Sequence, residues 1–192
     1  MSDSKAILCM LILMRLKTEL SHFDRLRLHK SALMVNIFSQ KKCFTIIDPT
    51  LTYFDEIDKL SVEIKKVQEQ YGSDTAKTLE LTLQSVDLQV KESYNRSTPY
   101  VLQSAGFVDS ITDDKTLILA SAIVGIVGKC GSPTTNDIEF YMDKIGCQQD
   151  YSRKDIISAA INLEKTGVIV KTESSYKLNN NFKDVSGYVR LI

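Results

Sequence analysis

The chain has 192 residues, 43% of them hydrophobic, so it is long enough and apolar enough to bury a core in one large domain or two small ones. Its 24 basic and 24 acidic residues cancel, which excludes an overall electrostatic field that would attract nucleic acid or anionic lipid. The longest apolar runs, at 6–14 and 117–127, are too short to cross a bilayer, so we expect a cytoplasmic globular protein with reduced cysteines.

The first 50 residues predict a helical unit. Residues 5–17 are apolar on nearly every side of a helix, which is typical of a helix buried all round. Ser21 is a candidate cap for a second helix, in which Phe23 would pack inward. The β-prone run at 44–47 predicts a short strand. Two helices and a strand would make an N-terminal unit with some features of a degenerate winged helix.

Basic residues lie between the apolar positions of these two helices and would face solvent or a partner. The first interpretation is a solvated basic face. The second is a docking surface for an acidic partner or a phosphate backbone. The candidate partner-binding residues are Arg15, Arg25, Arg27 and Lys30, with Lys17 on the same face.

The region at 51–104 predicts a helical hairpin and a linker. Apolar residues in 53–71 alternate spacings of three and four, which is typical of a heptad seam. The segment at 78–91 fits either one helix or two strands, because its apolar residues satisfy both periods. We favour the helix, since the residues between the apolar positions form helices readily. The stretch at 95–99 breaks the pattern and is the candidate linker.

The clearest pattern lies at 152–178. Ser152 and Asp155 are spaced to satisfy free N–H groups at a helix start reciprocally. An apolar stripe follows, and the helix ends at Gly167, a residue that readily adopts the left-handed conformation of a C-cap. Two β-prone runs on either side of Glu173 then predict a hairpin. The stripe consists of Ile156, Ala160 and Leu163 with Ile157 and Ile161 beside them, and the strands span 168–170 and 176–178.

Two further helices are predicted before this pattern. Thr112 is the candidate cap of the first, which the sequence at 131–133 stops. Thr134 with Asp137 opens the second, and Gly146 closes it. The predicted order is therefore helix, helix, helix, hairpin.

The sequence Leu-Glu-Lys-Thr-Gly-Val-Ile-Val at 163–170 resembles the end of the third helix and the first wing strand in the winged-helix superfamily. The resemblance covers 112–182. It implies a mainly α fold with a small β component, in which a C-terminal winged-helix domain at 105–192 follows the helical hairpin and the N-terminal helical unit. Winged helices bind DNA, RNA or other proteins on the same scaffold, so the resemblance leaves the function open.

Reactive side chains are few and scattered. His22 and His29 are seven residues apart, without a short-spaced ligand pair, and we interpret both as ordinary surface or amphipathic residues. The Gly-x-x-Gly-Lys sequence at 125–129 lies inside an apolar helical pattern and lacks the context of a phosphate loop. Cys130 and Cys147 are interpreted as small buried groups. We predict no enzyme, no cofactor and no metal site.

Nucleic-acid binding is the remaining chemistry with residues to support it. A DNA-reading winged helix places its third helix in the major groove and its wing on phosphates. Asp155, Glu164 and Glu173 interrupt this surface with negative charge, so we expect weak, salt-dependent binding. The candidate nucleic-acid-binding residues are Arg153, Lys154, Ser158, Asn162, Lys165, Lys171 and Lys177.

In size and element order, the chain resembles the small accessory subunits of bacterial SMC-type ATPase systems. These include winged-helix kite subunits and the middle components of Lamassu-type phage-defence systems. The resemblance extends to the apolar helix at 7–16 and the second helix after it. It implies a non-catalytic subunit of an SMC-like or ABC-type ATPase complex that bridges ATPase and effector, with DNA contacted jointly and no membrane. The alternative is a winged-helix transcriptional regulator that binds operator DNA as a homodimer.

Overall fold

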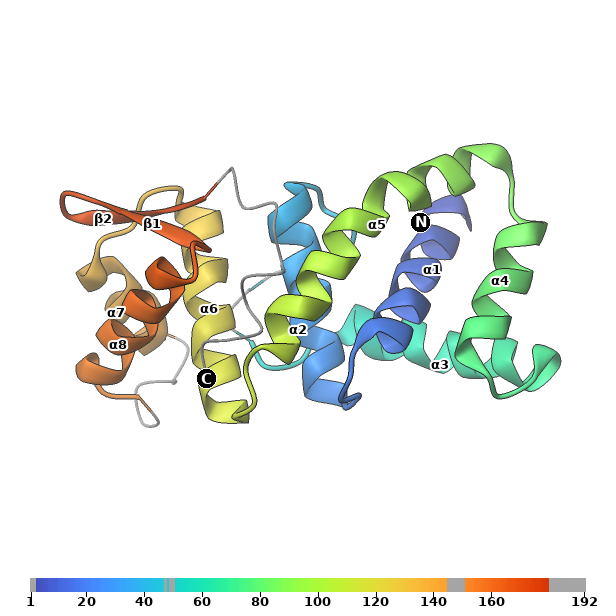
Figure 1. Cartoon of the computed structure of the whole chain (residues 1–192), viewed down its shortest axis with the longest axis horizontal. Coiled ribbons are helices and arrows are strands. Elements are labelled where there is room, and N and C mark those ends of the chain that lie inside the picture. The colour runs from blue at the N-terminus through green and yellow to red at the C-terminus, as the bar shows by residue number, and fades with distance from the viewer. Residues whose placement is uncertain (1–2, 47, 49–50, 145–150, 180–192) are drawn as a thin grey trace. The chain divides into compact units, whose positions relative to one another are not determined.

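The computed structural model describes residues 3–46, 48, 51–144 and 151–179. This described part contains eight helices and a two-stranded antiparallel sheet (Figure 1). The predicted class, mainly α with a small β component, is confirmed. Within the described residues, no helix combines the length and the hydropathy needed to cross a bilayer. The chain divides into two compact units, one formed by Met1–Ile46 with Tyr53–Asp109 and the other by Ile47–Thr52 with Ser110–Ile192.

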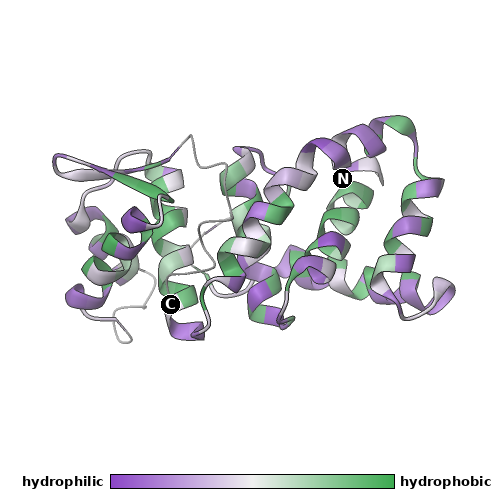
Figure 2. Ribbon diagram, in the orientation of Figure 1, coloured by the Kyte–Doolittle hydropathy of each residue, from purple (hydrophilic) through white to green (hydrophobic). Residues whose placement is uncertain are grey.

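The first unit is built around its first helix. Helix α1 packs against each of the other four helices, and α2 also packs along α5. Apolar residues recur along α1 (Figure 2), as expected for a helix that other helices cover on several sides and that therefore exposes little surface to solvent. Helices from the predicted regions 1–50 and 51–104 therefore share one core. The helices are α1 (Asp3–Glu19), α2 (Arg25–Ser39), α3 (Asp55–Tyr71), α4 (Thr75–Ser85) and α5 (Leu88–Asp109).

The ambiguous segment at 78–91 forms no strand, so the two-strand alternative is wrong, but it is not one continuous helix either. Helix α4 ends at Ser85 and α5 begins at Leu88, so the segment is helical on both sides of a break at Val86 and Asp87. Asp74 caps α4, because its carboxylate accepts hydrogen bonds from the backbone N–H groups of Ala76 and Lys77. Helices α3 and α4 pack against each other and, more extensively, against α1, so the apolar seams of the predicted hairpin are shared with a third helix.

Helix α5 runs through the stretch at 95–99, so the linker predicted there is wrong. Pro99 lies inside the helix and has no N–H to donate to the carbonyl of Asn95. The helix persists because its buried face, which includes Tyr94 and Val101, packs on α1 and α2. Tertiary burial here outweighs the helix-breaking tendency of proline.

The strand predicted at 44–47 does not form in its described residues, 44–46. The side chain of Asn36 in α2 forms hydrogen bonds with the backbone N–H and carbonyl of Phe44, which are the groups that would pair with a neighbouring strand in a sheet. The backbone N–H of Phe44 donates to Asn36 Oδ1 at 2.9 Å, and Asn36 Nδ2 donates to the Phe44 carbonyl at 2.7 Å. The Phe44 side chain is fully buried, so the amide and the core together position this segment without a sheet.

Helix α2 begins one turn later than predicted. Its N-cap is Asp24, whose carboxylate accepts a backbone N–H of the first turn at 2.8 Å. Ser21, the predicted cap, lies before the helix and donates its backbone N–H to Asp109 Oδ2 at 2.8 Å. Phe23, which was expected to pack inward, is 48% exposed, and Lys17 Nζ lies 5.1 Å from its ring centroid. The expectation for Phe23 is therefore wrong, because it lies outside the helix.

The second unit contains three helices followed by two strands, in the predicted order. Helix α6 packs against α7, α8 and β2, while α8 also packs against α7 and β1. The register of the sheet pairs Ile169 with Leu178 and Thr172 with Ser175. The elements are α6 (Asp114–Cys130), α7 (Thr135–Lys144), α8 (Arg153–Lys165), β1 (Ile169–Thr172) and β2 (Ser175–Leu178).

The loop between α6 and α7 lies beside β2. Thr134 forms an isolated antiparallel bridge with Ser175, and the backbone N–H of Tyr176 donates to the carbonyl of Pro133 at 2.9 Å. The hydroxyls of Ser132 and Ser175 are 2.7 Å apart, within hydrogen-bonding distance. These contacts connect the ribbon to the beginning of α7.

The ends of α6 follow the predicted signals closely. Asp113 is the N-cap, one residue after the predicted Thr112, and its carboxylate accepts the N–H of Thr116 at 2.7 Å. The helix ends at Gly131, as predicted. Gly146, the predicted end of α7, lies outside the described residues.

Candidate interaction surface on the C-terminal unit

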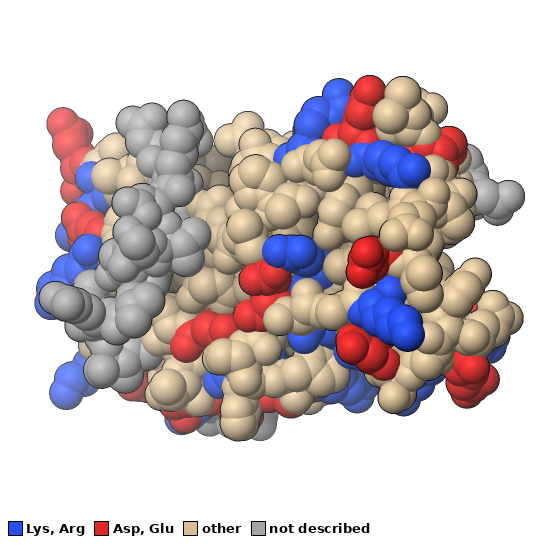
Figure 3. Space-filling view, turned by 45° about the vertical axis from the view of Figure 1, so that its right-hand side comes forward, with Lys and Arg blue, Asp and Glu red and all other residues tan. Residues whose placement is uncertain are grey.

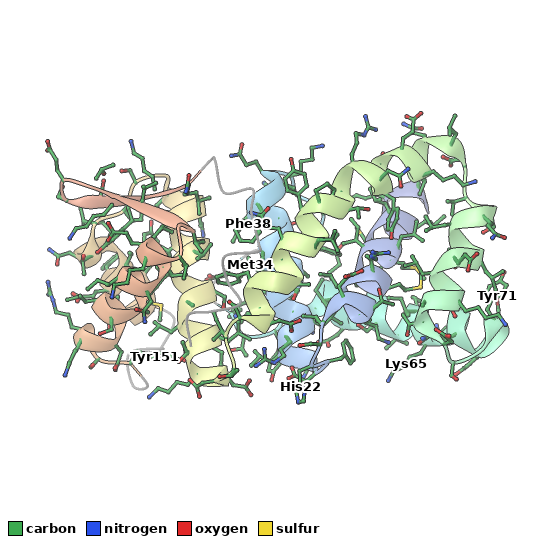
Figure 4. The ribbon with its side chains drawn as sticks, viewed as in Figure 1. His22, Met34, Phe38, Lys65, Tyr71 and Tyr151 are labelled. Atoms are coloured by element: carbon green, nitrogen blue, oxygen red, sulfur yellow. The ribbon has the colours of Figure 1, made fainter. Side chains whose placement is uncertain are left out.

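Helix α8 begins at the predicted capping box. The backbone N–H and the hydroxyl of Ser152 donate to Asp155 Oδ2 at 2.8 and 2.7 Å, and the N–H of Asp155 donates back to the Ser152 hydroxyl at 3.3 Å. The two hydrogen bonds that Ser152 donates hold the pKa of Asp155 below its ordinary value. Tyr151, just before the cap, donates its hydroxyl to the carbonyl of Lys115 at 2.9 Å and so holds this end of α8 on α6 (Figure 4).

Gly167 connects α8 directly to β1. Its φ is +75°, a left-handed conformation that side chains disfavour. Gly167→Ala is expected to lower the free energy of unfolding by about 1 kcal/mol, a cost of backbone strain alone, since an added Cβ meets only Asn179 Nδ2 at 3.8 Å. Denaturant unfolding measures the change.

The matched control is Gly128→Ala. Gly128 is exposed on α6 and has a negative φ, so alanine should stabilise there by about 0.5–1 kcal/mol. Gly167→Ala is thus expected to lower the free energy of unfolding, and Gly128→Ala to raise it. A neutral or stabilising Gly167→Ala would contradict the left-handed turn.

The apolar stripe of α8 divides into a buried and an exposed part. Ile156, Ala160 and Leu163 are buried, as the sequence predicts. Ile157 and Ile161, predicted beside the stripe, are 36% and 41% exposed. The burial of the first three residues fixes the rotation of the helix, so the two isoleucines face outward.

The exposed isoleucines belong to a row that we name the α8 ridge, which consists of Arg153, Ile157, Ile161 and Lys165. Its members are four residues apart and so lie along one face of the helix. The ridge is apolar in the middle and basic at both ends. The other candidate residues of α8 are also exposed and form the neighbouring row with the same spacing; they are Lys154, Ser158 and Asn162.

Arg153 already has partners in α7. Its guanidinium donates to Glu139 Oε2 at 3.1 Å and to Asn136 Oδ1 at 3.2 Å. The pair with Glu139 compensates the charge of Arg153 and holds the beginning of α8 against α7. Arg153 is therefore less available to a phosphate than its exposure suggests.

The ribbon does not bring its two candidate lysines together. Lys171 lies opposite Tyr176 in the register, and Lys177 lies opposite Val170. Directly paired residues share a face of an antiparallel ribbon, and adjacent residues alternate. Tyr176 is buried while Val170 is 45% exposed, so Lys171 is on the inward-facing side of the ribbon and Lys177 on the outward-facing side. Both lysine side chains are nevertheless exposed.

Two of the four residues predicted to form an exposed basic face on the first unit are buried, so the prediction is wrong for them. Arg27 and Lys30 are 5% and 0% exposed. Arg27 Nη1 donates to the carbonyl of Val108 at 3.0 Å, and Lys30 Nζ lies 5.7 Å from the ring centroid of Phe54. The sequence pattern missed this burial because α2 packs along α5 and α1, which lie far from it in the chain.

The other two residues are exposed or half-buried but paired. Arg15 forms a 2.6 Å ion pair with Glu19, and Arg25 forms a 2.6 Å pair with Asp58. On the face of the molecule in Figure 3, basic and acidic side chains are interspersed, without a continuous basic area. Because two of the four predicted residues are buried and the other two are paired with carboxylates, the four do not form a free cationic surface.

A polar network around His29 is the feature that sequence reasoning missed. The backbone N–H of Phe54 donates to His29 Nδ1 at 2.8 Å, so Nδ1 is unprotonated and the ring proton is on Nε2, which lies 3.1 Å from Asp58 Oδ1. Arg25 donates twice to the same carboxylate and lies 4.1 Å from the ring centroid of Tyr53. No local motif connects these positions, which meet only because α2 and α3 are brought together.

The pKa values in this network have clear causes. His29 is 1% exposed, and burial lowers the pKa of its imidazole, although the Asp58 carboxylate acts in the opposite direction. The hydrogen bonds from Arg25 lower the pKa of Asp58. Both imidazole nitrogens have partners, so the network connects α2 with α3 and with the residue that precedes α3. His22, by contrast, is exposed and points away from the helices (Figure 4).

Thiols and other metal ligands do not form a reactive centre in the described part of the chain. Burial raises the pKa of Cys9 to about 12, which leaves its thiol protonated and unreactive. Cys130 is exposed, so the prediction that it is buried is wrong, and Cys147 lies outside the described residues. Among the residues described, no three His, Cys, Asp or Glu side chains are positioned to hold a metal ion. The sequence at 125–129 lies inside α6.

All seven candidate nucleic-acid residues are thus on the surface, but they do not form one uniformly basic face. Two isoleucines occupy the middle of the α8 ridge, and the ribbon lysines are on opposite faces. Comparisons of the chain with protein-family models, curated proteins and solved structures found no match.

Proposed function

We propose that the C-terminal unit is a winged helix and that the chain is a non-catalytic accessory subunit that works by contacting other proteins. Three helices followed by an antiparallel ribbon support the winged-helix assignment. The isolated bridge between Thr134 and Ser175 adds support, because it pairs the loop between the first two helices of the unit with the ribbon. In this assignment α8 is the helix that a winged helix offers to its target.

The observation that carries the functional proposal is the exposure of Ile157 and Ile161 in the middle of the α8 ridge. Side chains that read DNA mostly donate or accept hydrogen bonds at base edges, whereas isoleucine offers a base only apolar contact. A compact apolar centre with a polar rim is typical of protein–protein interfaces. The ridge therefore favours a protein target over a nucleic acid.

We further propose that this subunit belongs to a bacterial complex built around an SMC-like or ABC-type ATPase, of the kind used in phage defence. The resemblance in chain length and element order supports this assignment. The subunit would bridge the ATPase and an effector, with DNA contacted jointly by the assembly. It uses no cofactor in this role.

The second candidate is a winged-helix transcriptional regulator that binds operator DNA as a homodimer. The surface exposure of the seven candidate residues favours it. The two proposals differ in what the purified chain does alone, since a regulator must bind its operator tightly at physiological salt.

An electrophoretic mobility shift assay tests the choice. With the purified chain and fragmented genomic DNA of its host at moderate salt, we expect no sequence-dependent retention at nanomolar protein concentrations. Binding at those concentrations that is specific for one fragment and survives random competitor DNA would contradict the subunit proposal and support the regulator.

The paired substitution Arg153→Glu with Lys177→Glu tests whether this surface contributes to DNA contact by the assembly. Both side chains are exposed, but Arg153 pairs with Glu139, whose side chain is only 18% exposed, so we expect the free energy of unfolding to fall by about 1 kcal/mol, too little to unfold the chain. DNA retention by the reconstituted complex should fall, with a shallower dependence of affinity on salt. Unchanged retention would exclude this face from DNA contact.

A further inference from the structure

We infer that the α8 ridge is the docking site for an acidic amphipathic helix of a partner protein. This inference rests on the proposed function as a protein-contacting subunit and specifies the chemistry of the contact. Three features of the ridge support it: the spacing of its members, the exposed apolar centre and the charge around that centre.

The spacing of the ridge suits a helical occupant. Ile157 and Ile161 are one turn apart on the same face, so their side chains are neighbours, about 6 Å apart at Cβ. From Arg153 to Lys165 the ridge extends about 18 Å at the rise of an α-helix. A row of side chains at this spacing fits into the groove between rows of a second helix. Two apolar residues of the occupant, three or four positions apart, would cover both isoleucines.

The charge around the isoleucines selects an acidic occupant. Lys165 lies on the ridge itself, one turn beyond Ile161. Lys154 lies in the neighbouring row with Ser158 and is about one turn before Ile157. Among the described residues, neither lysine makes an ion pair. Glu164 is the acidic residue on the other side of the ridge. Carboxylates of the occupant one turn before and after its apolar pair would therefore meet Lys154 and Lys165, two cations without an ion-pair partner in the described part of the chain, on the side of the ridge away from Glu164.

The same charges argue against a second copy of the chain as the occupant. Two α8 ridges packed against each other would place Lys154 and Lys165 of one copy near the same lysines of the other. Like charges at an interface are unfavourable. Charge complementarity therefore favours an acidic helix over a second copy of the chain as the occupant of the ridge.

Selection from a display library of random helical peptides tests this inference with the full chain as bait. We expect enriched peptides to carry two apolar residues at helical spacing, with Asp or Glu one turn before and after. For a synthesised peptide of this class, the Kd measured by fluorescence anisotropy should rise at least tenfold when the bait carries Ile157→Ser with Ile161→Ser. Serine and isoleucine have similar helix propensities, so α8 should remain folded, which circular dichroism checks.

Two control variants make the result specific. Val62→Ser replaces an exposed apolar residue on α3 and should leave the Kd unchanged. Lys154→Gln with Lys165→Gln should weaken binding severalfold and reduce its dependence on salt. Enriched peptides that lack acidic residues, or that bind the Ile157→Ser, Ile161→Ser variant as tightly as the original chain, would overturn the assignment of the ridge.

Two other outcomes separate failure of this inference from failure of the proposed function. If the chain dimerises and the isoleucine substitutions abolish the dimer in analytical ultracentrifugation, the occupant is a second copy and the inference is wrong, while a protein-contacting role stands. If a labelled DNA duplex binds at nanomolar concentration and the same substitutions abolish that binding, both the inference and the proposed function are overturned.

Discussion

Replacing Phe44 with alanine is expected to lower the free energy of unfolding by about 3–5 kcal/mol. The ring is fully buried, and the backbone of the same residue is held on both sides by the Asn36 amide. Because these hydrogen bonds hold the segment in place, the structure cannot close around the cavity left by the ring. Urea denaturation followed by circular dichroism measures the change.

Phe23→Ala is the matched control for this prediction. Its ring is 48% exposed and contacts Lys17 at the surface, so its removal should cost less than about 1 kcal/mol. Comparable losses in the two variants would contradict the placement of Phe44 in the core and of Phe23 outside it.

The protein is expected to become less stable as the pH falls from about 7 to about 5, with His29 as the main cause. Burial lowers the pKa of His29 in the folded state, whereas in the unfolded chain it keeps the ordinary value of about 6.5. The unfolded state therefore takes up the proton first. Stability is complete above about pH 6.5 and is lost as the pH falls toward the lower pKa of the folded state.

The hydrogen bonds of the imidazole give this loss a structural cause. Nδ1 accepts the backbone N–H of Phe54, so a proton on Nδ1 would point at another donor. Asp58 opposes the effect, because its carboxylate favours the charged imidazole, but burial is the larger influence. His29→Asn should flatten the pH dependence between 7 and 5, since the Asn Oδ1 can accept the N–H of Phe54 without titrating. Thermal unfolding across this pH range is the measurement.

His22→Asn provides the control, because it replaces the exposed histidine and leaves the network around His29 intact. The carboxylates whose pKa values are lowered, such as Asp58, titrate below this window and do not obscure the result. A pH dependence that survives His29→Asn would show that another group is responsible.

Signals that act over a few residues were read correctly from the sequence. The Ser152–Asp155 capping box and the turn at Gly167 are where the pattern at 152–178 predicts them, and the ribbon follows at once. These features depend on hydrogen bonds and backbone conformations within one turn of the chain. The errors at helix starts ranged from one residue at α6, where Asp113 is the cap in place of Thr112, to one turn at α2, where Asp24 is the cap in place of Ser21.

Features that depend on packing between distant segments could not be read in this way. The candidate site is the clearest case: the sequence pattern predicts an apolar stripe on α8, but it does not specify which part of the stripe α6 covers. Ile157 and Ile161 are exposed because the contacts of α8 stop short of them. The ridge became visible only once the rotation of α8 was known.

The sequence by itself determined the helical class, the positions of most helices and the ribbon at 169–178, because periodicity and capping are local properties. The tertiary structure alone decided that Lys30 is buried, that His29 meets Asp58 and that α5 continues through Pro99. Each of these outcomes depends on groups far away in the chain. The free energy of burial and of hydrogen bonding is set only when those groups are brought together.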